Sequence, residues 1–490
     1  MKKLSGLDAS FLHMETATMY GHVASLVVVD PKTSRSGDVY GDLRRTFEER
    51  LHILPVYRRR LVGDALGLDH PYWVDDANLD LDFHVREIAL PAPGDEHQLG
   101  EQVARIMARP LDRSRPLWEC YVISRLADGT VAILNKLHHS TIDGVSGAEL
   151  LYVLLDTDPG AVGVEPPAEP WEPEREPTSL ELLARAVLGY ATRPREGLRL
   201  QLRLLRMLAD LSGNPAVRQV AMTAIPGIRR FARLNRAEAA DPPALPNRPA
   251  PRTPWNQSVT PHRRFAMQTL RLSDAQTVKR AFDITVNDVV LALCATALRR
   301  YLADHGGIPE APLLVMVPVS VRAAEEADIY SSRVTGVITS LHTNIADPVE
   351  RMRAIHNSMA AAKEVQRAIP ADMLTDITHF APPTLFTQAV RLATRVRIVD
   401  RLSPPFNLTI SNVPGPRQPL YLGGALMKHF YPVSIVAEGQ GLNITVQSYL
   451  DNLDFGLIAC RGLMPDLWNL ADHLADAMAE LLVAAREGGD

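Results

Sequence analysis

The feature that most constrains the fold is an apolar run, residues 131–134, that leads within a few residues to two adjacent histidines, His138 and His139. An apolar stripe at helical spacing follows at residues 145–154, so the region predicts a buried strand, a turn and a helix. The turn falls at an Asp-Gly pair, residues 143–144. A histidine at the end of a buried strand is held by its surroundings and can still face a cavity, and it can take a proton near neutral pH. The sequence therefore predicts a candidate base at this junction.

Two domains are expected from the length, because 490 residues exceed what one hydrophobic core usually supports. Predicted strands and helices alternate in both halves of the chain, which indicates an α/β (α+β layered) fold with two similar domains around a central cleft. An Asp-Gly pair at 128–129 predicts a hairpin between two of the strands. We place the first domain at residues 1–160, a Pro-rich and basic helical linker at 161–262, and the second domain at 263–490.

Composition excludes several classes of protein. The net charge of −5 gives no reason to expect nucleic acid as a partner. Cys120, Cys294 and Cys460 lie in separate apolar runs and match no zinc spacing, so we expect them to be small core residues in a reducing compartment. No stretch approaches the roughly 18 apolar residues of a membrane span, and the start of the chain lacks a signal-peptide core. We therefore expect a cytoplasmic protein, soluble or peripheral to a membrane.

A basic segment, residues 179–236, stands out within this acidic chain. It holds eleven arginines against three acidic residues, a net charge of +8. Apolar residues recur at helical spacing beside several of these arginines, as in a helix that lies on an anionic lipid surface. A connecting helix that packs on the domains, with its arginines in water, is the alternative interpretation.

Several kinds of chemistry can be tested against the histidine pair. Adjacent residues of a strand point to opposite faces, so only one of the two histidines can readily face a cleft. A zinc site would need further ligands at helical or turn spacing, and a serine hydrolase would need a G-x-S-x-G segment, which the chain lacks. The remaining hypothesis is a histidine that acts directly as general base on a hydroxyl or thiol. On the residues alone, two histidines satisfied within a core remain the alternative.

The motif His-His-x-x-x-Asp-Gly, residues 138–144, resembles the signature of the acyl-CoA-dependent acyltransferases built like chloramphenicol acetyltransferase. More narrowly, the chain resembles the bacterial wax ester synthase/diacylglycerol acyltransferase family. This resemblance runs nearly end to end and rests on an ordered set of segments: residues 4–12, 115–119, 138–144, 287–290, 318–322, 411–416 and 431–433. It implies two chloramphenicol acetyltransferase-like domains packed around a central cleft or tunnel.

The resemblance also implies roles for residues of the motif. His139 would be the base that removes the proton of the acceptor, and His138 would support it. Asp143 would be structural and pair with an arginine, for which Arg322 at a strand end in the second domain is the candidate. Two glycines would leave room beside the base for an acyl chain or pantetheine. These are Gly144 and Gly147.

Further residues are expected to stabilise the reaction or the site. Asn287 is the candidate donor to the oxyanion that forms when an alkoxide attacks a thioester, and losing such a donor typically costs about 3–4 kcal/mol. It lies at a predicted helix start, so a plain helix cap is the alternative, with Thr285 as the other candidate for the cap. Candidates for substrate binding on a later strand are Thr409, Ser411 and Asn412. Candidates for structural support are Asp288, Pro116 and Trp118, the last two with an acyl-pocket role as the alternative.

The function implied by the resemblance is an O-acyltransferase without a covalent enzyme intermediate. A long-chain acyl group would move from acyl-CoA to the hydroxyl of diacylglycerol, giving triacylglycerol, or of a fatty alcohol, giving a wax ester. No cofactor beyond the acyl-CoA substrate is expected, no metal, and peripheral contact with a membrane or lipid-droplet surface is part of the hypothesis. Two alternatives stay open: an acyltransferase that uses a carrier-protein thioester or a polar acceptor, and a non-catalytic lipid-binding protein.

Overall fold

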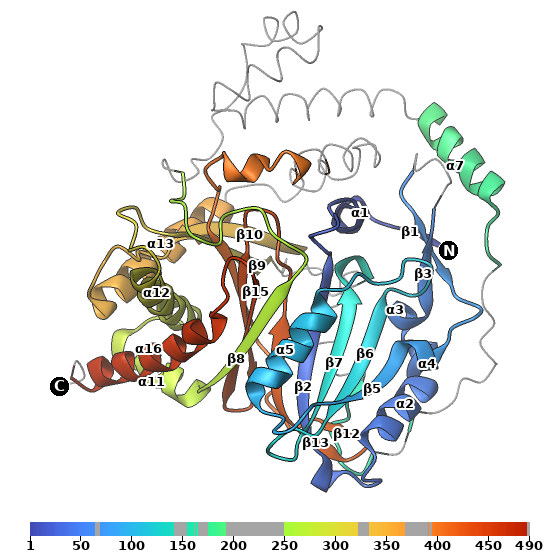
Figure 1. Cartoon of the computed structure of the whole chain (residues 1–490), viewed down its shortest axis with the longest axis horizontal. Helices are drawn as coiled ribbons and strands as arrows, with labels where there is room; N and C mark the ends of the chain where they lie inside the picture. Colours follow the sequence, from blue (N-terminus) through green and yellow to red (C-terminus); the bar gives the residue numbers. More distant parts are fainter. Residues whose placement is uncertain are drawn as a thin grey trace, which may run out of the picture.

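Two six-stranded sheets, each with helices beside it, form the framework of the protein in its computed structural model (Figure 1). The structure describes residues 1–63, 69–141, 154–161, 163–164, 175–192, 249–321, 333–367, 391 and 394–487. The predicted mixed α/β fold is confirmed. The three cysteines are free and buried in the core, also as predicted.

The first sheet has the strand order β12-β13-β2-β7-β6-β5, and only its β5–β6 pair is parallel. Its strands are β2 (His22–Asp30), β5 (Val85–Ala89), β6 (Trp118–Ser124), β7 (Val131–His138), β12 (Tyr421–Leu422) and β13 (Ala425–Val433). The predicted hairpin joins β6 to β7, and Gly129 has the positive φ of 79° that this turn requires. A small sheet beside it, in the order β1-β4-β3, contains β1 (Lys2–Lys3), β3 (Arg59–Val62) and β4 (Tyr72–Asp75).

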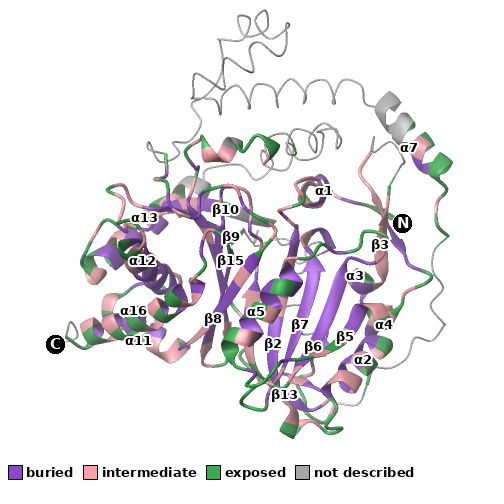
Figure 2. Cartoon of the chain, viewed as in Figure 1, coloured by how far each residue is buried: buried purple, intermediate pink, exposed green. Residues whose placement is uncertain are grey.

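The second sheet has the strand order β10-β9-β11-β14-β15-β8, with β11 parallel to both of its neighbours. Its strands are β8 (Arg263–Arg271), β9 (Leu314–Val321), β10 (Arg333–Ser340), β11 (Leu408–Val413), β14 (Leu442–Tyr449) and β15 (Asn452–Cys460). One face of this sheet packs on helices whose apolar sides form a single large core with it, while the other face turns toward the first sheet. Figure 2 shows the strands of both sheets as mostly buried.

The helices differ in how they are buried. The helix α12 (Val286–Asp304) is buried on nearly all sides and begins with a capping box. In it, the Thr285 side chain accepts from the backbone N–H of Asp288, and the Asp288 side chain accepts from the backbone N–H of Thr285. The helices of the first half are α1 (Gly6–His13), α2 (Val39–Arg50), α3 (Pro55–Arg58), α4 (Leu81–His84), α5 (Glu96–Met107) and, after it, α7 (Ser179–Thr192). Those of the second half are α11 (Leu272–Phe282), α12 (Val286–Asp304), α13 (Pro348–Arg367) and α16 (Leu467–Glu487). Short 3-10 helices are η1 (Pro31–Thr33), η2 (Leu51–Ile53), η3 (His139–Thr141) and η4 (Ile398–Asp400).

The second half of the chain contributes strands to the first sheet. Strand β13 comes from the second half but pairs with β2 of the first sheet, so the first sheet contains residues outside the predicted first domain, 1–160. The exchanged strand also touches the second sheet so closely that a Cβ on Gly456 would lie 1.8 Å from the carbonyl oxygen of Pro432. The limits of the domains stay a prediction, but a cut at residue 263 would separate β12 and β13 from the sheet that they complete.

Helix α5 lies across the first sheet and beside β8 of the second (Figure 1). A Cβ on Gly100 of this helix would lie 2.7 Å from the carbonyl oxygen of Phe265, so the helix and the strand are in direct backbone contact. His97, near the start of α5, stacks on Trp468 of α16 with ring centroids 4.2 Å apart. Residues of α5 and of both sheets form one shared hydrophobic cluster, which fixes the two halves against each other.

Within the ranges that the structure describes, no single helix is long and apolar enough to cross a bilayer. Helices α11 and α12 together, bent by 103°, meet the length and composition requirement.

Candidate active site

The histidine pair lies at the end of a strand that is hydrogen-bonded on both sides. Strand β7 pairs with β2 and β6, and His138 is its last residue, opposite His22 of β2. His139 is already the first residue of the 3-10 helix η3, although its backbone N–H still donates to the carbonyl oxygen of Gly21 at 2.7 Å. The two histidines therefore do not lie on one continuous strand. The directions of the two histidine side chains are set instead by the turn that follows β7. In this turn the hydroxyl of Thr141 donates to the carbonyl of His138 at 2.7 Å.

His138 is almost fully buried, with 2% of its surface exposed, and both of its ring nitrogens are hydrogen-bonded. Its Nδ1 accepts from the backbone N–H of Ser140 at 3.1 Å and lies 2.7 Å from the Ser140 hydroxyl. An Nδ1 atom that accepts from an N–H carries no proton, so the neutral ring must hold its proton on Nε2. That Nε2 lies 3.2 Å from Oε1 of Glu15, to which it donates. These contacts hold the ring in one orientation and one tautomer.

Glu15, which follows α1, is the centre of the contacts beside His138. Its Oε1 also accepts from the backbone N–H of Gly21 at 2.7 Å, and its Oε2 accepts from the guanidinium of Arg113 at 2.6 Å. Burial by itself would raise the pKa of Glu15. The hydrogen bonds that its carboxylate accepts from His138, Arg113 and the backbone N–H of Gly21, with the charge that His138 would carry when protonated, outweigh burial and lower the pKa to about 2. A Cβ on Gly21 would lie 2.7 Å from His138 Nε2, so this close packing requires a glycine.

The His139 ring is held by stacking. It lies against the ring of Phe11 from α1, with centroids 3.9 Å apart and planes 20° from parallel. Its Nδ1 is buried and has no hydrogen-bond partner among the described residues. Burial, and next the charge that His138 would carry, lower the pKa of His139 to about 4. The imidazole is therefore neutral at physiological pH, with a nitrogen lone pair able to accept a proton.

Buried side chains of β7, which carries His138, and of its neighbour β2 are hydrogen-bonded to the end of helix α5. Lys136, two residues before His138, is fully buried and donates to the carbonyl oxygens of Ile106 at 3.1 Å and Arg109 at 2.6 Å. Burial lowers its pKa to about 8, against the opposing charge of Glu119. His22 Nε2 lies 2.8 Å from the carbonyl oxygen of Met107. The open carbonyls at the end of α5 are thus satisfied by side chains from β2 and β7.

Four of the predicted site residues lie outside the described residues: Asp143, Gly144, Gly147 and Arg322. The predicted ion pair of Asp143 with Arg322, and the predicted space beside the two glycines, stay predictions.

At the start of α12 the structure decides between the two candidates for the helix cap, Thr285 and Asn287. Thr285 is the N-cap, and Asp288 completes the capping box and also accepts from His356 Nδ1 at 2.8 Å. Asn287 is therefore not the cap. Its side chain is partly exposed, and no residue in the described ranges accepts a hydrogen bond from its amide.

The predicted substrate-binding residues of β11 divide between the two faces of the second sheet. Thr409 and Ser411 lie on the face that turns away from α12, and Asn412 lies on the opposite face together with the core residues Leu408 and Ile410. Within the described ranges, no hydrogen bond, ion pair or ring contact joins these three residues or Asn287 to the histidine pair.

Beside Thr409 and Ser411 lies a buried polar row that the sequence analysis missed. Their cross-strand neighbours on β14 are Asn443 and Thr445, and the same face continues to Gln447. The Nε2 of Gln447 is buried without a hydrogen-bond partner in the described ranges. The signal was present in the sequence as polar residues alternating with Ile444 and Val446.

Trp118 is the first residue of β6 and Pro116 lies two residues before it, and both are buried. Trp118 is 1% exposed, donates from Nε1 to the carbonyl of Tyr57 at 2.7 Å, and stacks on His84 with centroids 4.3 Å apart. The carbonyl of Pro116 accepts from the backbone N–H of Trp118 at 2.9 Å. These contacts favour the structural interpretation of both residues over an acyl-pocket role.

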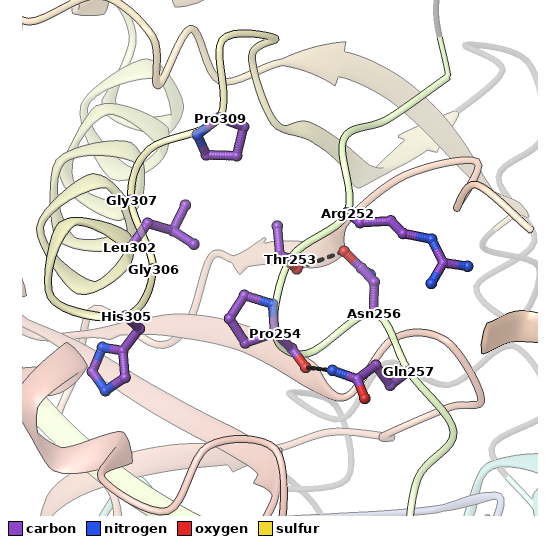
Figure 3. A pocket seen from close by; sticks show the side chains of 10 residues that line it. All are labelled: Arg252, Thr253, Pro254, Asn256, Gln257, Leu302, His305, Gly306, Gly307 and Pro309. Carbon is purple, nitrogen blue, oxygen red and sulfur yellow. Dashed lines mark hydrogen bonds between the residues drawn. The ribbon is translucent and has the colours of Figure 1, made fainter. Parts of the chain in front are cut away.

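A cavity of about 290 Å³ lies elsewhere, between the segment after residue 251 and the end of α12 (Figure 3). Its polar groups are engaged within the protein: Thr253 donates to Asn256 at 2.6 Å, and Arg252 donates to the carbonyls of Val399 and Leu402. None of the predicted site residues lines it. The candidate base therefore remains at the histidine pair, where His139 Nδ1 has no hydrogen-bond partner among the described residues.

Comparison with known proteins gives consistent matches over the whole chain. The family model described as "Wax ester synthase/diacylglycerol acyltransferase catalytic domain" matches residues 4–290, and the "WS/DGAT C-terminal domain" matches residues 331–482. A Mycobacterium tuberculosis protein whose name assigns it to the diacylglycerol O-acyltransferases is 37% identical over 98% of this chain and 90% of its own length. A second protein of that organism, similarly named, is 37% identical over 98% of this chain and 99% of its own. The solved structure of the wax ester synthase/diacylglycerol acyltransferase from Marinobacter aquaeolei VT8 matches with a TM-score of 0.68 and 31% identity, over 99% of this chain and 100% of that one.

Proposed function

The chain belongs to the wax ester synthase/diacylglycerol acyltransferase family and is an acyltransferase, and we propose that His139 is its general base. The proposed reaction moves a long-chain acyl group from acyl-CoA to the hydroxyl of diacylglycerol, of a fatty alcohol, or of both. The observation that carries the proposal is the state of the His139 ring. It is neutral, stacked on Phe11 and placed directly after the end of β7, beside a His138 whose own nitrogens are already engaged.

The proposed mechanism needs no covalent bond to the enzyme. His139 takes the proton of the acceptor hydroxyl as its oxygen attacks the thioester carbonyl, which produces a tetrahedral oxyanion. The oxyanion collapses, the C–S bond breaks, and the proton passes from the imidazolium to the departing thiolate to give CoA and the ester. The thioester is already activated, so we propose no cofactor. Help from a general base of this kind typically contributes 10²–10⁴-fold to a rate.

The amide of Asn287, which no described residue engages, is the proposed donor to the oxyanion. The start of α12 favours negative charge, because the positive end of the helix dipole lies there. We also propose that Asp143 pairs with Arg322 to hold the loop after His139.

The acceptors are lipids, so we propose that the protein works in the cytoplasm at the surface of a membrane or lipid droplet. The support is the basic segment 179–236, of which the structure describes residues 179–192. In that part, α7 exposes Leu180 and Leu188 to solvent at 78% and 64%. Apolar side chains held outward on a helix within a basic segment suit an anionic lipid surface.

The test is to incubate purified protein with labelled palmitoyl-CoA and either dioleoylglycerol or hexadecanol, and to separate the neutral lipids. We expect triacylglycerol, wax ester or both from the wild type, and a loss of at least about 100-fold in His139→Ala. His52→Ala is the matched control, because His52 is a partly buried histidine of η2, outside the site. Circular dichroism checks that His139→Ala keeps the fold. Absence of neutral lipid product with both acceptors would exclude the proposed reaction, and normal turnover in His139→Ala would exclude the proposed base.

A further inference from the structure

A small basic cavity lies where the two halves meet, between α5, the start of β8 and the end of β15. Its volume is about 40 Å³, room for about three water-sized groups and hence for the oxygens of one phosphate. Its lining consists of Glu101, Ala104, Arg105, Ala108, His262, Arg263, Arg264 and Arg461. Four arginines thus surround a cavity that holds a single carboxylate.

The positive charge of this cavity is not balanced within the described part of the protein. The ion pair of Arg105 with Glu101, at 3.1 Å, uses the one acidic residue. Arg263 is buried and donates to backbone carbonyls only, those of Thr260, His262 and Thr18. No carboxylate in the described ranges lies within ion-pair distance of it.

The other two arginines keep donors available for a ligand. Arg264 has a buried Nε without a hydrogen-bond partner in the described residues, and no ion pair to its guanidinium is present there. Arg461, just after β15, is exposed and likewise has no carboxylate partner within those ranges. Uncompensated arginines in a protein of net charge −5 mark a site that attracts an anion, and the planar guanidinium matches phosphate oxygens well.

The cavity is connected to the histidine pair by two short routes. Arg263 donates to the carbonyl of Thr18 at 2.6 Å, in the same loop that supplies Glu15 and Gly21 to the pair. On the other wall, Ala108 follows Met107, whose carbonyl contacts the ring of His22, the cross-strand neighbour of His138. The cavity is therefore joined to the candidate base through the loop before β2 and through the end of α5.

We propose that this cavity binds a phosphate of the nucleotide part of acyl-CoA. The inference rests on the proposed function, which makes acyl-CoA the donor. A phosphate held by Arg264 and Arg461 anchors the far end of the donor, while the pantetheine arm extends toward His139. The arginines take no part in the chemical step, so they determine the binding of the donor and not the rate of turnover once it is bound.

The test uses the full-length double variant Arg264→Gln/Arg461→Gln. Its matched control is Arg271→Gln/Arg280→Gln, which removes the same two charges from exposed positions at the far end of β8 and on α11. Calorimetric titration with adenosine 3′,5′-bisphosphate and with CoA should show roughly 10- to 100-fold weaker binding in the double variant, and no change in the control. The KM for palmitoyl-CoA should rise by a similar factor at unchanged kcat. The difference from wild type should vanish with palmitoyl-pantetheine, which has no phosphate.

The titrations separate this inference from the proposed reaction, because they need no turnover. Equal affinity of wild type and double variant for CoA would overturn the assignment of the cavity even if acyl transfer is normal. Inorganic phosphate that binds the wild type as tightly as CoA would also overturn it, since the cavity would then be a general anion site. Binding to phosphatidylglycerol vesicles that the double variant loses, with CoA binding intact, would assign the arginines to a lipid surface instead.

Discussion

Glu15 is the residue on which the orientation of the histidine pair depends. One carboxylate oxygen accepts from both His138 Nε2 and the backbone N–H of Gly21, and the other accepts from Arg113. The carbonyl of the same Gly21 accepts from the N–H of His139. Glu15 thereby connects the α1 region to both histidines, and we interpret it as a positioning residue.

Replacing Glu15 by Gln keeps the shape of the side chain but removes its charge. Its pKa of about 2 in the folded protein lies below the ordinary value of 4.5, so the ionised group stabilises the fold, by roughly 3 kcal/mol at most. That contribution is complete above pH 4.5 and is lost as the pH falls toward 2. We therefore expect Glu15→Gln to have a lower free energy of unfolding in urea than wild type at pH 7. At pH 3.5 the difference in this free energy between the two proteins should be smaller. The exposed Glu87→Gln should show neither effect, and a difference independent of pH would contradict the role of the charge.

The pH dependence of catalysis follows from His139. Its pKa is lowered to about 4, so the ring is neutral and able to accept a proton at all higher pH values and becomes protonated only below that. We expect kcat/KM, which reports the free enzyme, to stay level from pH 8 down to about 5.5 and to decrease only as the pH approaches 4. Initial rates at subsaturating palmitoyl-CoA across this range measure it. An acidic limb centred near 6.5, the ordinary value for histidine, would contradict the burial of this ring.

At the scale of elements, the start of α12 contains one residue that we expect to affect stability, Thr285, and one that we expect to affect catalysis, Asn287. Thr285 caps the helix through its hydroxyl, whereas Asn287 makes no such bond. We expect Thr285→Ala to lower the free energy of unfolding by about 1 kcal/mol with little effect on kcat. Thr277→Ala on α11 controls for loss of an exposed hydroxyl.

Asn287→Ala should leave the thermal midpoint nearly unchanged and lower kcat by roughly 10²–10³-fold if its amide stabilises the oxyanion. A large loss of stability in Asn287→Ala, or normal kcat, would contradict the assignment.

The features that could be predicted from the sequence are those set by residues close together in the chain. The β6–β7 hairpin depends on Gly129 and its neighbours, and the start of α12 depends on Thr285 and Asp288 three residues later. The features that were missed depend on distant residues. Glu15 is 123 positions from His138, and nothing near either of them indicates that they meet. His139 leaves the strand because of a turn that local alternation of side chains does not reveal.

At the scale of the whole molecule, the same limit explains the exchanged strand. The sequence indicated two halves of similar content, and each half does contain a six-stranded sheet. Yet β13 completes the first sheet although it follows β11 of the second. Without β13, one edge of β2 would be an unpaired apolar edge strand, which is prone to aggregation. The exchange therefore makes folding of the first sheet depend on the second half of the chain.

Gly456 is the position at which this exchange can be tested. It lies on β15, where any Cβ would come within 1.8 Å of the carbonyl oxygen of Pro432 on β13, so even alanine forces the exchanged strand away from the second sheet. We expect Gly456→Ala to lose more than about 4 kcal/mol of stability or to fail to accumulate as soluble protein. Gly462→Ala is the control, because its nearest neighbour, the Cγ2 of Thr260, is 4.0 Å away. Soluble yield and thermal midpoint measure both variants. A Gly456→Ala protein as stable as Gly462→Ala would mean that β13 and β15 can separate without cost.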